Sequence, residues 1–85
     1  MIEIKIAFYN EKDWPRFLAI VDDKENLHEH WEDWHQSYCK TVADLQKLKF
    51  VVKKKVIDLD KLIAYCKEHK LRNNGETRSR FTQLG

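Results

Sequence analysis

The apolar pattern between Leu27 and Leu48 constrains the fold most, because this stretch contains neither glycine nor proline. Its apolar side chains recur every three or four residues, at Leu27, Trp31, Trp34, Tyr38, Val42, Leu45 and Leu48. This spacing predicts an amphipathic helix over 27–48. At about 1.5 Å per residue the helix would span roughly 33 Å, the width of a small domain. We therefore expect a central helix on which the other elements pack, with Trp31 and Trp34 anchoring the core.

Two segments have the alternating pattern of half-buried strands. Every second residue in the first segment is large and apolar, namely Ile2, Ile4, Ile6 and Phe8, and this pattern predicts a strand over 2–9. A second strand is predicted over 50–57, where Phe50, Val52 and Val56 would face the core beside the aliphatic part of Lys54. A tight hairpin at the lysines is the less favoured alternative, since it contains no Gly, Asn or Asp.

Shorter helices are predicted over 14–22 and 59–70. Asp13 and Asp58 precede them as N-caps, and Pro15 is tolerated in a first turn. Asp23 or Asn26 is the expected cap of the long helix. Asn73-Asn74-Gly75 should end the helix over 59–70, with Asn74 or Gly75 taking a positive φ. Thr77 is expected to cap a short tail helix from which Phe81 and Leu84 pack back onto the core.

These elements predict an α+β fold for residues 1–85. Eighty-five residues provide for one compact domain with one core. The expected architecture is a small two-stranded sheet packed on a long central helix and two or three shorter helices, in the order β-α-α-β-α followed by the short tail helix.

The composition predicts a cytoplasmic protein that does not associate with membranes. The first residues lack the basic and apolar regions of a signal peptide, and no run approaches the ~20 apolar residues of a membrane span. In the cytosol we expect Cys39 and Cys66 to be reduced thiols, with a disulfide between two helices as the alternative.

Four residues on one face of the long helix are weak candidates for metal ligands: His28, Glu32, His35 and Cys39. Such side chains bind zinc and related metals, and residues four apart on a helix can share an ion. However, one helical ridge cannot surround a tetrahedral metal, and no H-E-x-x-H motif is present. We therefore favour a polar flank beside the aromatic residues, and expect no metal and no other cofactor.

Aromatic and basic side chains provide the other candidate sites. The core or interaction anchors are Trp14, Trp31, Trp34 and Tyr38, which would alternatively form a stacking platform for single-stranded nucleic acid. The candidate phosphate contacts are Lys53, Lys54, Lys55, Lys67, Lys70, Arg72, Arg78 and Arg80. A solvated charged face is the simpler interpretation of these basic residues.

The charge is divided unevenly along the chain. Residues 1–48 carry 6 Lys/Arg against 10 Asp/Glu, and residues 49–85 carry 10 against 4. This asymmetry suits a nucleic-acid surface, attraction between the two halves of one fold, or a head-to-tail dimer. Enzyme signatures such as G-x-S-x-G or a phosphate-binding glycine loop are missing from the sequence, so we expect no catalytic activity.

Several short motifs spread over most of the chain resemble one type of small bacterial protein. They are Asp13-Trp14-Pro15, Trp31, Val52-x-x-x-Val56-x-Asp58, Tyr65-Cys66 and Arg78-x-x-Phe81. Where such proteins usually have a glycine before the second strand, this chain has Lys49-Phe50. The resemblance implies a compact bacterial α+β domain. It transfers no functional residues, because these proteins have no assigned activity.

The sequence thus predicts a non-catalytic module that binds another protein or forms a homodimer. The alternative is a basic accessory protein that binds nucleic acid through the lysines and arginines of its C-terminal half.

Overall fold

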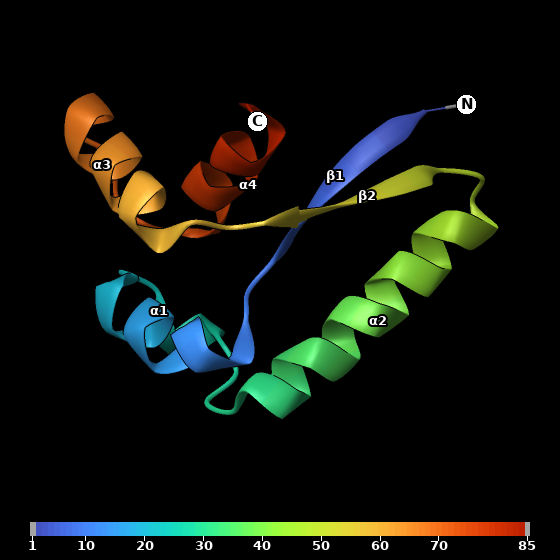
Figure 1. Cartoon of the computed structure of the whole chain (residues 1–85), viewed down its shortest axis with the longest axis horizontal. Helices are drawn as coiled ribbons and strands as arrows, with labels where there is room; N and C mark the ends of the chain where they lie inside the picture. The colour runs from blue at the N-terminus through green and yellow to red at the C-terminus, as the bar shows by residue number, and fades with distance from the viewer. Residues whose placement is uncertain (1, 85) are drawn as a thin grey trace.

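The computed structural model describes residues 2–84 and has the predicted α+β architecture (Figure 1). Its two strands are β1 (Glu3–Phe8) and β2 (Val51–Val56), and its α-helices are α1 (Trp14–Ile20), α2 (Trp31–Lys47), α3 (Leu59–His69) and α4 (Gly75–Leu84). Two 3-10 turns, Glu11–Asp13 and Lys24–Asn26, precede α1 and α2. No helix within residues 2–84 is long and apolar enough to cross a lipid bilayer.

The two strands pair in parallel, with Glu3 opposite Val51 and Phe8 opposite Val56. Parallel strands need a long crossover, and α1 and α2 supply it. Figure 1 shows α2 on one side of the strands and α3 and α4 on the other. Phe8 packs on Trp34 and Tyr38 of α2, with ring centroids 5.4 and 5.2 Å apart.

The buried core lies at the end of the strands, where the chain turns into α1 and α3. Its members are Tyr9, Trp14, Phe17, Ile57, Leu59 and Leu62. The expectation that α2 anchors the core is wrong, because α2 contains no fully buried residue. Trp31 and Trp34 are half-buried and pack on the rim of this cluster. A sheet of only two strands covers a narrow strip of the helix, so most of α2 stays outside.

The helix predicted from Leu27 begins only at Trp31. Two tryptophan indoles donate hydrogen bonds to backbone carbonyls near this start. The indole of Trp14 donates to the Glu29 carbonyl at 3.2 Å, and the indole of Trp31 donates to the Tyr9 carbonyl at 2.7 Å. These bonds hold the segment before α2 against β1 and α1. The N-cap is His30, without a side-chain hydrogen bond, and neither Asp23 nor Asn26 caps the helix.

The starts of α1 and α3 agree with the prediction, whereas α1 ends at Ile20, two residues before the predicted end, and Asp13 makes no side-chain cap hydrogen bond. Pro15 lies in the first turn of α1, after Asp13 at the N-cap position. The Asp58 carboxylate accepts hydrogen bonds from the backbone N–H groups of Asp60 and Lys61, at 3.0 and 3.2 Å. This side-chain cap fixes the junction between β2 and α3.

The turn between α3 and α4 differs from the prediction at both of its ends. Lys70, and not Asn74 or Gly75, takes the left-handed conformation that ends α3, with φ 55°. Asn74 caps α4, since its side-chain oxygen accepts from the Thr77 N–H at 3.0 Å. Thr77 itself is a buried helical residue. Phe81 packs on the core as predicted, whereas Leu84 is exposed.

Candidate functional site

The outer edge of β1 is partly protected by side chains. The backbone hydrogen bonds to β2 are made by the even-numbered residues of β1, as the bonds at Ile2 and Phe8 show. Lys5, Ala7 and Tyr9 therefore direct their backbone N–H and C=O groups outward, away from β2. The Gln83 side-chain amide donates to the Lys5 carbonyl at 2.8 Å. With the Trp31 indole on the Tyr9 carbonyl, both ends of this edge are capped. Ala7 lies between the caps.

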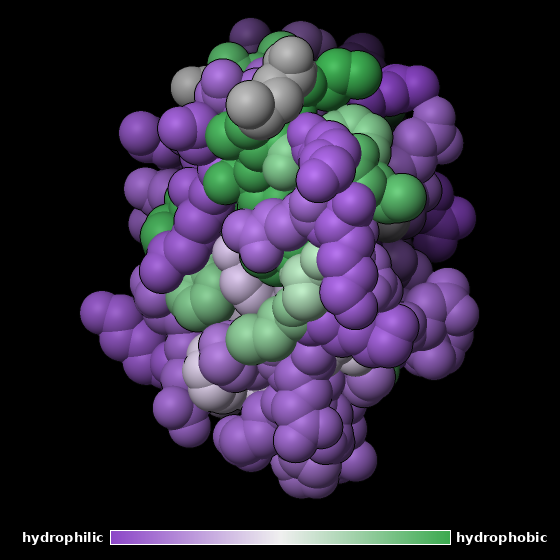
Figure 2. Space-filling view, turned by 90° about the vertical axis from the view of Figure 1, so that its right-hand side faces the viewer, coloured by the Kyte–Doolittle hydropathy of each residue, from purple (hydrophilic) through white to green (hydrophobic). Residues whose placement is uncertain are grey.

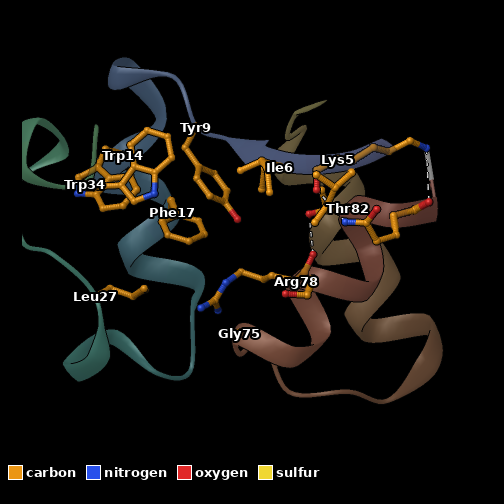
Figure 3. Close-up of a pocket in the computed structure, with 14 residues that line it drawn as sticks. Lys5, Ile6, Tyr9, Trp14, Phe17, Leu27, Trp34, Gly75, Arg78 and Thr82 are labelled. Carbon is orange, nitrogen blue, oxygen red and sulfur yellow. Dashed lines mark hydrogen bonds between the residues drawn. The ribbon is translucent and has the colours of Figure 1, made fainter. Parts of the chain in front are cut away.

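The cavity beside this edge has a volume of about 490 Å³ (Figure 3). Side chains from both faces of β1 line it, as expected beside a strand edge, together with Leu27, Trp34 and residues of α4. Its apolar walls include Ile6, Leu27 and Trp34, and its polar residues include Ser79 and Gln83. The volume is within the range of small-ligand sites, about 300–1,000 Å³.

Tyr9 provides a hydroxyl to this cavity. Only 6% of the residue is exposed, and its ring packs on Phe17 with centroids 4.2 Å apart. Figure 3 shows the hydroxyl pointing into the space between Ile6 and Arg78. No buried side-chain polar atom within residues 2–84 lacks a hydrogen-bond partner, so this hydroxyl, which bonds to no residue of the described chain, is open to solvent in the cavity. Burial raises the pKa of Tyr9 to about 12, so the hydroxyl keeps its proton at neutral pH.

Arg78 is a structural residue and is not available to a phosphate. It is 8% exposed, and its Nη1 and Nη2 atoms donate to the two Asp23 carboxylate oxygens at 2.9 and 2.8 Å. Nη1 also donates to the Asn73 carbonyl at 2.9 Å. The hydrogen bonds from Arg78 hold the pKa of Asp23 below its usual value. The prediction of Arg78 as a nucleic-acid contact is therefore wrong.

The other basic candidates are separated on the surface. Lys53, Lys54 and Lys55 lie on β2, whereas Lys67 and Lys70 flank a hollow beside α1 that is lined by Ile20 and Asp22. Arg72 is exposed in the turn after α3, and Arg80 pairs with Glu76 at 2.7 Å. Lys54 Nζ also lies 4.4 Å from the centre of the Phe8 ring. Only the three lysines of β2 are neighbours, and the alternation of a strand directs Lys54 to the opposite face from Lys53 and Lys55.

No protein-family model, curated protein or solved structure matches this chain.

The four metal candidates do not form a common site. His28 lies outside α2 and approaches Ser37, with Nε2 and Oγ 3.3 Å apart, while Glu32 is exposed. His35 and Cys39 are neighbours, with Nε2 and Sγ 3.8 Å apart. No group of three or more His, Cys, Asp or Glu residues within 2–84 is arranged to hold a metal ion. Both cysteines are free thiols, Cys39 exposed and Cys66 half-buried, and burial raises the pKa of Cys66.

The aromatic candidates divide between the core and the surface of α2. Trp14 is buried, whereas Trp31, Trp34 and Tyr38 are half-buried. Trp31 stacks on His35 with ring centroids 4.6 Å apart. Tyr38 contacts Trp34 and Phe8, and Trp34 also contacts the core rings of Tyr9 and Trp14. Partial burial raises the pKa of Tyr38.

An apolar surface lies where β1 and β2 begin, and we call it the apolar sheet end. It consists of Ile2, Leu48, Phe50 and Val51. Ile2 and Leu48 are 67% and 69% exposed, and the Val51 N–H donates to the Ile2 carbonyl at 2.8 Å. Figure 2 shows apolar residues gathered on this part of the surface. The β2 edge beside it is unprotected: within residues 2–84 no side chain hydrogen-bonds to the outward backbone groups of Val52, Lys54 or Val56.

Sequence patterns do not reveal either the cavity or the apolar sheet end. Tyr9 falls on the face of the predicted strand opposite Ile4, Ile6 and Phe8, and nothing local shows that its hydroxyl opens into a cavity. The exposed Leu48 completes the apolar stripe of the long helix in the sequence, although α2 ends at Lys47.

Proposed function

We propose that this protein is a non-catalytic interaction module that associates with another polypeptide, first of all with a second copy of itself, through the apolar sheet end. The observation that carries this proposal is the exposure of Ile2 and Leu48 beside the unprotected edge of β2. Exposed apolar patches and unpaired strand edges are features that attract other chains. A two-fold dimer is the usual symmetry for a contact of one patch with itself.

The charge pattern favours contact at the sheet end over direct pairing of two β2 strands. An antiparallel pair of β2 strands would bring Lys53, Lys54 and Lys55 of both copies together, and like charges that face each other across strands are destabilising. The apolar sheet end buries its side chains without bringing these lysines opposite each other.

Two titratable groups of the cavity, Tyr9 and Arg78, support a non-catalytic role. A general acid or base works best when its pKa is near the working pH. Tyr9 has a pKa of about 12, and the guanidinium of Arg78 is fully engaged by Asp23 and Asn73. Neither group is poised to move a proton at neutral pH.

Sedimentation velocity over low to high micromolar concentrations tests self-association. We expect the mass to rise from 10.3 kDa toward twice that value, and Leu48→Glu to keep the protein monomeric. The matched control is Leu84→Glu, since Leu84 is 68% exposed but lies at the end of α4. A single 10.3 kDa species at every concentration, or equal effects of the two substitutions, would contradict the proposal.

A second candidate function, nucleic-acid binding, is favoured by one observation. Lys53 and Lys54 are exposed on one strand, and within residues 2–84 none of the three β2 lysines forms an ion pair. Fluorescence anisotropy with single- and double-stranded oligonucleotides tests it. Binding should weaken steeply with added salt and with Lys53→Gln/Lys54→Gln, but not with the control Lys67→Gln/Lys70→Gln. Equal losses for the two pairs would exclude β2 as the phosphate-binding surface.

A further inference from the structure

We infer that the cavity beside the outer edge of β1 binds a short, uncharged stretch of polypeptide in extended conformation. This site lies at the opposite end of β1 from the apolar sheet end and does not depend on self-association. Three observations carry the inference: the backbone groups of Ala7, the hydroxyl of Tyr9 and the largely apolar lining of the cavity.

Ala7 presents one donor and one acceptor to the cavity. Its N–H and C=O point away from β2, and no residue of the described chain hydrogen-bonds to them. A residue in an extended peptide has the complementary N–H and C=O pair, as in strand addition. The caps on the Lys5 and Tyr9 carbonyls limit the length, because those residues are about 13 Å apart at roughly 3.3 Å per residue. The opening therefore fits a segment of about three residues.

Tyr9 adds a directional hydrogen bond. Because the hydroxyl is open to the cavity, it can exchange a hydrogen bond with water for one with a ligand. The Tyr9 ring is fixed by Trp14 and Phe17, yet its hydroxyl points into the cavity without a protein partner (Figure 3). Since the hydroxyl stays protonated at neutral pH, it can donate to a ligand carbonyl. Tyr9 and Ala7 together would hold two successive peptide groups.

The lining favours uncharged side chains and an uncharged backbone. Ile6, Leu27 and Trp34 form apolar walls. Arg78 lies close to the Tyr9 hydroxyl, but its charge is neutralised by Asp23 through two hydrogen bonds. A ligand carboxylate placed beside Arg78 would lose water without gaining an unpaired cation there; the other cation of the lining, Lys5, donates an exposed hydrogen bond to the Gln83 carbonyl at 3.5 Å. At the Tyr9 end of the cavity, an internal peptide segment therefore fits better than a free chain end.

The test is a titration of ¹⁵N-labelled protein with acetyl-Val-Ala-Val-amide, followed by amide chemical shifts. We expect saturable shifts at Ala7 and Tyr9 and about tenfold weaker binding to Tyr9→Phe, the loss typical of one hydrogen bond. Tyr65→Phe is the matched control, because it removes a hydroxyl on α3, outside the cavity. The same peptide methylated on its central nitrogen should bind more weakly, since it cannot donate to Ala7.

Gly75→Leu is a second variant that does not involve Tyr9. Gly75 lines the cavity, and an added Cβ would meet no atom within 4 Å, so the substitution should fold and narrow the opening. Its binding should fall as well. Unchanged binding to both Tyr9→Phe and Gly75→Leu, or shifts confined to Val52, Lys54 and Val56, would overturn the inference. Tighter binding of the tripeptide with free ends would overturn the preference for an internal, uncharged segment.

Discussion

At the scale of single residues, Arg78 connects segments that are far apart in the sequence. Its guanidinium binds the Asp23 carboxylate and the Asn73 carbonyl, and it lies over the Phe17 ring, 5.4 Å from its centre. The neighbouring backbone bond from Asp22 N–H to the Asn73 carbonyl, 2.9 Å long, continues this connection. The network joins the loop after α1 to the start of α4.

Acid should weaken this network first. Because the hydrogen bonds from Arg78 lower the folded-state pKa of Asp23, its contribution to stability is complete above the ordinary pKa of about 3.9. The contribution is lost as the pH falls through the folded-state pKa. Asp23→Asn should reduce the free energy of unfolding by about 3 kcal/mol at neutral pH and flatten its acid dependence. Urea titrations at several pH values measure both effects.

The control for this substitution is Asp44→Asn. Asp44 pairs with Lys40 on the surface of α2 at 3.1 Å, and such pairs contribute less than about 1 kcal/mol. If the two variants had the same acid profile, the depressed pKa of Asp23 would not be stabilising the fold.

Trp14 should contribute more to stability than Trp31, although Trp31 lies on the long helix. Trp14 is 3% exposed and contacts Tyr9 and Phe17, whereas Trp31 is half-buried. Trp14→Ala should reduce the free energy of unfolding by about 3–5 kcal/mol. Trp31→Ala should cost less. Equal losses of unfolding free energy in chemical denaturation would show that α2 contributes to the core as much as α1 does.

At the scale of elements, Asp58 is the side chain that defines the start of α3. Asp58→Ala removes the acceptor of two backbone N–H groups and should cost about 1 kcal/mol. Asp60→Ala, two residues later, removes an exposed ion pair with Arg16 and a first-turn carboxylate but no capping hydrogen bond, and should cost less. Thermal melts of both variants distinguish the cap from a general effect of negative charge, which would make the two losses equal.

Two lysines adopt backbone conformations that favour glycine. Lys49 and Lys70 have φ values of 71° and 55°, and Lys49 stands directly before the residues that lead into β2. Lys70→Gly should raise the free energy of unfolding by about 0.5–1 kcal/mol, because the left-handed region strains a residue with a Cβ. Lys67→Gly, within α3, should lower stability by a similar amount. A loss from Lys70→Gly would show that the lysine side chain is needed at the turn.

At the scale of the whole molecule, stability should be unevenly distributed. The core residues come from the end of β1, α1, the end of β2 and α3, while α2 has no fully buried residue. Helices with few buried contacts open more easily. Native-state hydrogen exchange should therefore show faster exchange in the middle of α2 than around Leu62 in α3. Equal protection of the two helices would contradict this division.

The sequence by itself determined the features that depend on neighbouring residues. Alternating apolar side chains predicted both strands, and apolar side chains three or four residues apart predicted α2 and α3. Asp58 predicted a helix cap. These features follow from the geometry of a strand or a helix turn, so a window of a few residues contains the information.

Only the tertiary structure decided which residues are buried and which are paired. Arg78 and Arg80 are both arginines of α4, yet one is buried against Asp23, 55 positions away, and the other is exposed. The parallel register of β1 and β2, the late start of α2 and the unpartnered hydroxyl of Tyr9 also depend on distant segments. Burial and hydrogen bonding between such segments are set by how whole elements pack, and no local spacing of residues encodes that packing.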